Sequence, residues 1–239
     1  MQPAHDYLRH LTRRTFIGQA ARGIERSLFS RAVLDGITRL IAGPVVVHAH
    51  DWHTSLALMY MRTYSDLRKR YANTATVLSV HNAGYQGHFP ASMLHDCGIP
   101  PEVYTFQHLE WYDRINFLKG GLTFADMVVT VSPTHAQELR TPGGGFGLQE
   151  VFEWLGSRFT GITNGIDQAL WNPATDDQIT ANYSRQDPSN KAKCKAALQR
   201  SFGLPQLQRT PLFGLTGRMV VQKGLDLVLN SPLIWTLDA

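Results

Sequence analysis

The feature that most restricts the fold is a series of short apolar runs, rich in Val, Ile and Thr, separated by longer segments of helical pattern. The runs are residues 44–50, 75–80, 127–131, 159–163 and 211–216. Strands that alternate with helices in this way are typical of βαβ units and a parallel sheet. The runs do not alternate apolar with polar residues, so we expect strands buried on both faces. The predicted fold class is α/β, a parallel sheet with flanking helices.

The composition excludes several other classes of protein. Hydrophobic residues make up 43% of the 239 residues, which is enough for a core and argues against disorder. No apolar run approaches the roughly 18 residues that a membrane-spanning helix needs. The two cysteines, Cys97 and Cys194, form neither a disulfide framework nor a CxxC metal motif. We therefore expect a cytoplasmic protein with no membrane partner.

The positive charge is concentrated near the amino terminus. Residues 1–40 contain seven arginines against three acidic residues, and the rest of the chain is balanced. Nucleic-acid-binding proteins usually combine a dense Lys/Arg patch with aromatic residues, whereas these arginines are spread along a helix-like pattern. The sequence therefore predicts a solvated helix face and no nucleic-acid partner.

Polar and ionisable residues follow the predicted strands directly. Because ligands of open α/β sheets bind at the carboxyl ends of the strands, this distribution predicts one shared site. The residues in these positions are His48, His50, Asp51, His81, Asn82, Ser132, Asn164, Asp167 and Arg218.

The densest cluster is the segment 48–53, with the sequence HAHDWH. Its histidines and carboxylate are of the types that ligate zinc, so a metal-dependent hydrolase built on His48, His50 and Asp51 is one reading. The spacing fits poorly, because Trp52 separates Asp51 from His53 and no second group of ligands follows downstream. A ligand-binding role for Asp51, with histidines that pack or hydrogen-bond, is the better interpretation, and it needs no metal.

The segment 81–87 carries a second candidate site, in which a strand ends in a polar turn with two glycines. The side chains of His81, Asn82, Tyr85 and Gln86 offer donors and acceptors suited to a hydroxyl-rich molecule. The pattern indicates a sugar or nucleotide site, although a strand-end histidine beside a polar turn is an equally good reading of this motif alone.

Two further glycine-containing segments differ in how strongly they indicate a binding site. Arg218 lies at the end of a predicted strand, and Gln222 and Lys223 lie where a helix begins. Two cations beside a helix amino terminus suit the binding of a diphosphate. The alternative is that Arg218 and Lys223 are ordinary surface residues. The segment 143–147 lacks both the P-loop ending and the GxGxxG context, so it predicts a mobile loop.

Together these segments resemble bacterial glycogen synthases and plant starch synthases, which are glucosyltransferases of GT-B type with two Rossmann-like lobes. The resemblance is collinear from about residue 24 to residue 230. The matching stretches are residues 29–32, 48–53, 81–87, 116–121, 125–126, 130–133, 164–167, 171–176 and 222–226.

This resemblance implies transfer of glucose from ADP-glucose to the non-reducing end of an α-1,4-glucan, with retention of configuration and without a metal or other cofactor. It implies that His81 and Asp51 are catalytic. It also implies that two further sets of residues hold the sugar and the diphosphate. The sugar-binding residues are Asn82, Tyr85, Gln86 and Asn164, and the diphosphate-binding residues are Arg218, Gln222 and Lys223.

The resemblance also implies a division of the chain. Residues 1–22 are a basic segment that matches nothing in the family, 23–207 are part of the acceptor-side lobe, and 208–239 begin the nucleotide-sugar-binding lobe with one strand and one helix. Such enzymes are about twice as long, so we expect these 239 residues alone to be inactive. A degenerate glucan-binding or regulatory protein is the alternative, and the metal-dependent hydrolase is the third reading.

Overall fold

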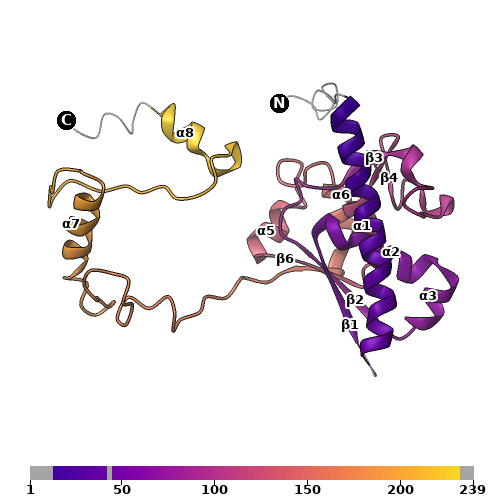
Figure 1. Cartoon of the computed structure of the whole chain (residues 1–239), viewed down its shortest axis with the longest axis horizontal. Helices are drawn as coiled ribbons and strands as arrows, with labels where there is room; N and C mark the ends of the chain where they lie inside the picture. Colours follow the sequence, from indigo (N-terminus) through magenta and orange to yellow (C-terminus); the bar gives the residue numbers. More distant parts are fainter. Residues whose placement is uncertain (1–12, 42–44, 232–239) are drawn as a thin grey trace. The chain divides into compact units, whose positions relative to one another are not determined.

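The computed structural model describes residues 13–41 and 45–231. They form two compact units that divide after Gly165 and are considered separately (Figure 1). The division after Gly165 does not test the expected lobe boundary at 207, which stays a prediction. Of the predicted 1–22 segment, residues 1–12 lie outside the described part and the remainder begins the first helix.

The first unit contains a four-stranded parallel sheet, a small antiparallel sheet and the helices around them. Its helices are α1 (Arg13–Leu40), α2 (Asp51–Thr63), α3 (Ser65–Arg70), α4 (Phe117–Phe124), α5 (Pro133–Glu138) and α6 (Gln149–Trp154), with 3-10 turns at Ala91–Met93, Pro101–Val103 and Gly156–Arg158. Its strands are β1 (Val46–His50), β2 (Ala75–Val80), β3 (His88–Pro90), β4 (Glu110–Trp111), β5 (Arg114–Asn116), β6 (Met127–Thr130) and β7 (Phe159–Gly161).

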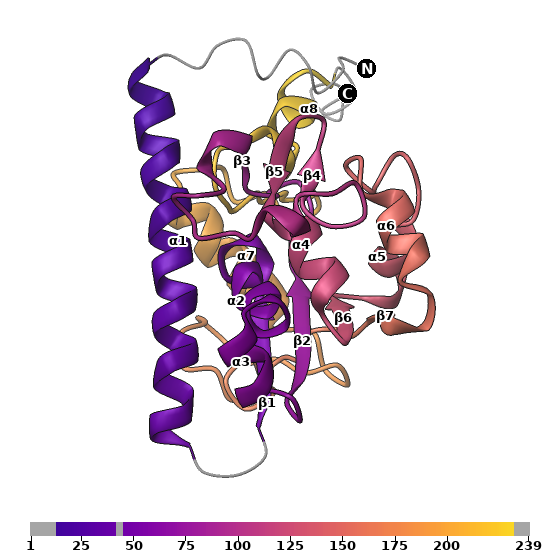
Figure 2. The same ribbon diagram turned by 90° about the vertical axis from the view of Figure 1, so that its right-hand side faces the viewer.

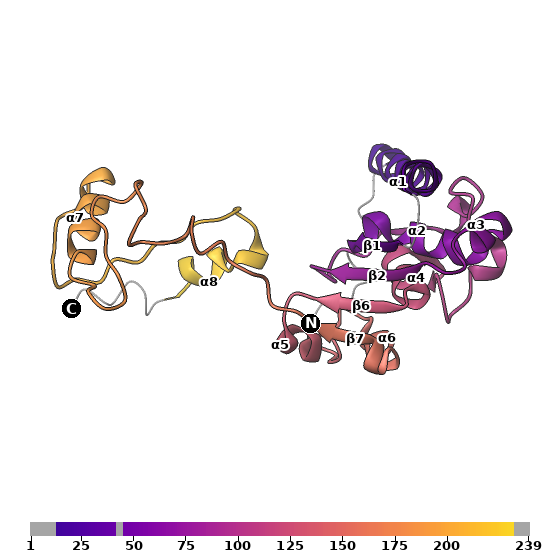
Figure 3. The ribbon, with the colours of Figure 1, turned by 90° about the horizontal axis from the view of Figure 1, so that it is seen from below.

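The parallel sheet has the strand order β1-β2-β6-β7 (Figure 3). These strands occupy four of the five predicted runs, so the predicted α/β class with a parallel sheet and flanking helices is confirmed. The antiparallel sheet β3-β5-β4 was not predicted, because its strands of two or three residues are too short to show a pattern.

Burial of the sheet differs from the expectation. Val47 and Ala49 of β1 are buried, whereas Val46, His48 and His50 are exposed. The prediction of strands buried on both faces is therefore wrong for β1, against which α2 packs. The exposed face of β1 is the face that carries the two histidines.

Helix α2 lies at the centre of the unit. Its residues from Ser55 to Met61 are all buried, because the helix packs against the sheet, α4 and α1. Helix α1 runs beside α2 and α3 (Figure 2) and buries a stripe of Gly23, Ser27, Ser30 and Leu34. The spacing of this stripe is helical, and its small residues allow close approach. In the described part of the chain, no helix combines the length and the apolar character needed to cross a bilayer.

Asp126 ties three elements together at the amino-terminal edge of the sheet. Its Oδ2 accepts hydrogen bonds from Arg62 Nη2 of α2 at 2.7 Å and from Thr76 N and Oγ1 of β2, both at 2.8 Å. Its own N–H donates to Thr76 Oγ1 at 2.9 Å. The carboxylate therefore holds α2 and β2 against the start of β6.

The second unit contains α7 (Lys191–Ser201), a 3-10 turn η5 (Val221–Lys223) and α8 (Leu225–Leu229). The one helix predicted within residues 208–239 is therefore present as α8, but the strand predicted at 211–216 is not formed. A strand needs a hydrogen-bonded neighbour, and the described residues of this unit provide none. Residues 232–239 of the predicted second lobe lie outside the described part.

We predict that Gly121 is required for the close approach of α4 to α2 and β2. A Cβ at this position would lie 2.5 Å from Ser55 Oγ and 3.0 Å from Leu78 Cδ2, whereas a Cβ at Gly36 of α1 would meet nothing within 4 Å. Gly121→Ala should therefore lower the free energy of unfolding by about 2 kcal/mol despite the better helix propensity of alanine. Gly36→Ala should raise it by about 0.5–1 kcal/mol. Denaturant unfolding of both variants checks this, and equal effects would contradict it.

His88 should make the stability depend on pH. Burial, and next the nearby Arg114 guanidinium, lower the pKa of His88 from 6.5 to about 4. In the unfolded chain His88 binds a proton below about pH 6.5, whereas in the folded protein it does so only below about pH 4. The free energy of unfolding therefore decreases as the pH falls from 6.5 to 4. Between pH 7 and pH 5 the loss due to His88 should be about 2 kcal/mol.

The variant His88→Gln checks this prediction by urea unfolding at pH 7 and pH 5. It should lose less stability over the interval than the wild type. The exposed His95 supplies the control, since His95→Gln should retain the full wild-type dependence. An unchanged slope in His88→Gln would show that other groups cause it.

Candidate functional site

The site begins at the sharp junction between β1 and α2. Asp51 is the first residue of α2 and has φ of 55°, a left-handed conformation that aspartate adopts more readily than most residues. The turn is fixed locally, because His50 N donates to Thr54 Oγ1 at 2.7 Å and this hydroxyl donates back to His50 O at 2.8 Å. The backbone thereby turns the Asp51 side chain toward the end of β2.

The Asp51 carboxylate connects the ends of two neighbouring parallel strands. Its Oδ1 accepts hydrogen bonds from His81 N at 2.8 Å and, less closely, from Asn82 N at 3.4 Å. The negative charge lies in the first turn of α2, where the helix dipole stabilises it. The two residues predicted to be catalytic, His81 and Asp51, are therefore brought together with Asn82.

Three histidine rings lie in a column on the exposed side of these strand ends. The His48 and His50 rings stack with centroids 4.3 Å apart, and those of His50 and His81 are 5.4 Å apart. His50 Nδ1 lies 3.1 Å from His81 Nε2, and His48 Nε2 lies 2.8 Å from Ser79 Oγ. Burial, and next the charges of His50 and His81, lower the pKa of His48.

The contact between the His50 and His81 rings was not predicted from the sequence. A signal was present, because the alternation of a strand places residues 48 and 50 on the same face, and the parallel neighbour brings residue 81 to it.

The metal reading of this cluster is not supported. Among the residues that the structure describes, no three His, Cys, Asp or Glu side chains are arranged to hold a metal ion.

The loop after β2 divides its polar residues between surface and interior. Asn82 Oδ1 accepts from Gly84 N at 3.0 Å and shapes the turn, and Tyr85 is exposed. Gln86 is buried instead, since its Nε2 donates to Ala83 O and Phe146 O, both at 2.9 Å, while its Oε1 accepts from Asn116 Nδ2 at 2.7 Å. These bonds use the hydrogen-bonding groups of Gln86 inside the protein, so it supports the loop from behind.

Gly87 ends this loop with φ of 68° beneath the indole of Trp52. A Cβ here would lie 2.4 Å from Trp52 Cε3, so only glycine allows the contact. The motif at 48–53 therefore packs directly on the motif at 81–87.

The glycine-rich segment 143–147 differs from the mobile loop that was predicted. A Cβ on Gly145 would lie 2.7 Å from Leu139 O and 2.7 Å from Gln149 Cβ, and one on Gly144 would lie 2.4 Å from Glu138 O. The glycines are therefore needed for a tight turn packed between α5 and α6. Its Phe146 carbonyl is the acceptor that anchors Gln86.

The remaining predicted residues lie apart from this cluster or in the other unit. Asn164 is exposed, three residues after β7 at the carboxyl edge of the sheet. Arg218, Gln222 and Lys223 belong to the second unit, where Lys223 N donates to Val220 O and Val220 N to Arg218 O, both at 2.9 Å. A Cβ on Gly217 would lie 4.0 Å from Lys223 Cγ, so the turn brings the Lys223 stem close to the backbone beside Arg218.

Comparison with known proteins identifies the family. The model of the starch synthase catalytic domain matches residues 7–154. The glycogen synthase of Anaeromyxobacter sp. (strain Fw109-5) is 40% identical over 228 residues, 95% of this chain and 46% of that protein. The glycogen synthase of Thermotoga maritima is 42% identical over 208 residues, 87% of this chain and 43% of that protein.

A solved structure agrees with these matches. The catalytic domain of starch synthase IV from Arabidopsis thaliana, bound to ADP and acarbose, has a TM-score of 0.75 and 36% sequence identity, over 85% of this chain and 42% of that one. This confirms the expected GT-B relationship. The chain spans less than half the length of the curated relatives described above. By its sequence, its parallel sheet and its structural match, the chain belongs to the glycogen and starch synthase family.

Proposed function

We propose that the protein transfers glucose from ADP-glucose to the non-reducing end of an α-1,4-glucan, with retention of configuration. The observation that carries this proposal is the junction of Asp51 with His81 and Asn82 at the carboxyl edge of the sheet, in a chain of this family. The ADP and acarbose in starch synthase IV support a nucleotide-sugar donor and a glucan acceptor. The curated names of the relatives support glycogen as the product.

In this proposal His81 contacts the glucose that is transferred. Its ring is exposed, and its backbone N–H is held by the Asp51 carboxylate. Asp51 fixes the start of the loop, so it acts as a positioning residue for His81. Asn82, Tyr85 and Asn164 offer polar groups to sugar hydroxyls, and Gln86 supports the loop from the interior.

Arg218, Gln222 and Lys223 are proposed to hold the diphosphate. In the reaction, the bond from glucose C1 to the diphosphate oxygen breaks, and a bond forms from C1 to O4 of the acceptor. The proton of that hydroxyl leaves with a phosphate oxygen of ADP. Two cations stabilise the charge that develops on the diphosphate, which lowers the barrier without a metal.

The proposal also includes a cytoplasmic location. It includes no cofactor and no nucleic-acid partner. No observation favours the degenerate glucan-binding protein or the metal-dependent hydrolase. The inactivity expected for these 239 residues alone stays a prediction, which the assay below tests when it is applied to the isolated chain.

Incorporation of labelled glucose into glycogen tests the proposed transfer. Protein purified from the cells that make it should incorporate glucose from ADP-glucose, with UDP-glucose compared in parallel. His81→Ala should reduce incorporation at least about a hundredfold, as expected when a group that acts in the transition state is lost. His95→Ala removes an exposed histidine elsewhere and should leave the rate unchanged. Folded protein from those cells that incorporates nothing, or an active His81→Ala variant of it, would refute the proposal, whereas the isolated 239 residues are expected to incorporate nothing.

The diphosphate role of Arg218 predicts a specific kinetic change. Arg218→Ala should lower kcat/KM for ADP-glucose by about 10- to 100-fold, because a charge-assisted hydrogen bond is lost. The KM for glycogen should change little. Arg209, an exposed arginine of the same unit, provides the matched control in Arg209→Ala. Equal kinetic effects of the two substitutions would exclude a donor-binding role for Arg218.

A further inference from the structure

The ring of His81 is exposed, although the backbone beside it is fixed. The Asp51 carboxylate accepts a hydrogen bond from His81 N, but this bond leaves the side-chain torsions of His81 free to rotate. An exposed side chain that must meet one reacting sugar loses its rotamer freedom at that moment, unless the protein has already restricted it. A second contact, to the ring itself, would therefore favour the reaction.

His50 makes this contact. Its Nδ1 lies 3.1 Å from His81 Nε2, which is within hydrogen-bond distance. The two rings are close to parallel, with an angle of 20° between their planes and centroids 5.4 Å apart. One of the two ring nitrogens of His81 is thus engaged by the protein. Among the residues that the structure describes, the other nitrogen, Nδ1, has no hydrogen-bond partner.

His50 can act as a support because its own backbone and ring are held. Its N–H donates to Thr54 Oγ1 at 2.7 Å, and its carbonyl accepts from the same hydroxyl at 2.8 Å. Its ring stacks on that of His48, with centroids 4.3 Å apart. His48 Nε2 in turn lies 2.8 Å from the hydroxyl of Ser79, a buried residue of β2. The column therefore runs from the sheet to the His81 ring.

The hydrogen bond also couples the hydrogen positions of the two rings. A neutral imidazole has one donor nitrogen and one acceptor nitrogen, and only one of His50 Nδ1 and His81 Nε2 supplies the hydrogen of their bond. The bond that one ring nitrogen makes decides whether the other nitrogen carries a hydrogen. His50 thereby restricts both the rotamer and the tautomer of the His81 ring.

We propose that His50 is a positioning residue for glucose transfer, which holds the His81 ring by Nε2 so that Nδ1 meets the transferred sugar. This inference rests on the proposed function. Two consecutive residues at the junction of β1 and α2 then divide the task, since Asp51 fixes the backbone of His81 and His50 fixes its ring. A group that is held in advance acts mainly in the transition state. Loss of His50 should therefore lower kcat more than it raises the KM for ADP-glucose.

Two substitutions of nearly equal shape separate the hydrogen bond from the volume of the side chain. Asparagine carries polar atoms on Cγ, where histidine carries Nδ1, and leucine carries methyl groups there. In protein purified from the cells that make it, His50→Leu should lower kcat about tenfold and change the KM for ADP-glucose less than about twofold, because one hydrogen bond is lost. His50→Asn should recover most of this loss. His95→Leu, at an exposed histidine elsewhere, is the control and should leave kcat unchanged.

A residue that acts through His81 loses its effect when the His81 ring is absent. In the His81→Ala background, His50→Leu should therefore reduce the residual rate of transfer by less than about twofold. A further reduction of about tenfold in that background would show that His50 acts independently of His81, and it would overturn the inference.

Acylation by diethyl pyrocarbonate tests the contact without any glucose transfer. The reagent attacks an imidazole nitrogen that is free to react, so hydrogen bonding slows the attack. Mass spectrometry that resolves the site should show His81 modified about fivefold faster in His50→Leu than in the wild type, with His50→Asn close to the wild type.

Two results of these experiments would overturn the inference. One is equal modification of His81 in the wild type and His50→Leu, and the other is an equal loss of kcat in His50→Leu and His50→Asn. Wild-type protein that transfers no glucose would instead refute the proposed function. The modification rates would still decide whether His50 holds the His81 ring.

Discussion

The rest of the first unit depends on the burial of α2 between the sheet, α4 and α1. Every residue of α2 from Ser55 to Met61 is buried, and this close packing requires Gly121 in α4, where a Cβ would lie 2.5 Å from Ser55 Oγ. Apolar burial over seven consecutive residues is a large stabilising contribution for one helix. It also fixes where α2 begins. Because Asp51 is the first residue of α2, the packing of the core determines the position of the carboxylate that the site uses.

From this position a single carboxylate joins two strands through backbone atoms. Asp51 Oδ1 accepts from His81 N and Asn82 N, so the start of the 81–87 loop follows the start of α2. Trp52 packs on Gly87 at the other end of the same loop, and Gln86 fastens its middle to Phe146 and Asn116. A loop held at three points presents His81 and Tyr85 with little freedom. Such preorganisation favours a site that stabilises a transition state.

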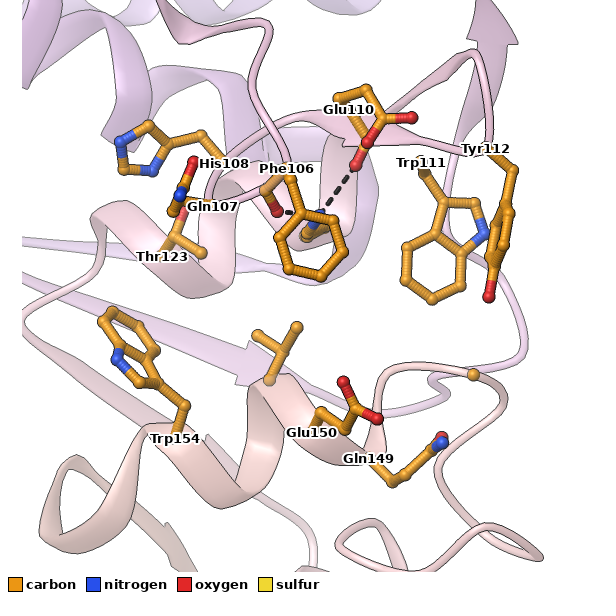
Figure 4. Close-up of a pocket in the computed structure, with 13 residues that line it drawn as sticks. Phe106, Gln107, His108, Glu110, Trp111, Tyr112, Thr123, Gln149, Glu150 and Trp154 are labelled. Carbon is orange, nitrogen blue, oxygen red and sulfur yellow. Dashed lines mark hydrogen bonds between the residues drawn. The ribbon is translucent and has the colours of Figure 1, made fainter.

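The tight turn at 144–147 connects this loop to a pocket in the first unit that is lined by Phe106, Trp111, Tyr112 and Trp154 (Figure 4). Phe146 anchors Gln86 on one side, and Gly147 lines the pocket on the other.

The amino-acid sequence alone indicated the four parallel strands, the polar residues at their carboxyl ends and the family, because buried strands and collinear motifs are local patterns. It also placed Asp51, His81 and Asn82 at one edge, since the ends of parallel strands meet there. Three features could be seen only in the folded protein: His50 contacts His81, Gln86 faces inward, and the glycines at 144–145 form a packed turn. It also showed that no strand forms at 211–216. These features depend on contacts between residues far apart in the chain, for which hydrogen-bond partners and steric neighbours leave no signal in local periodicity.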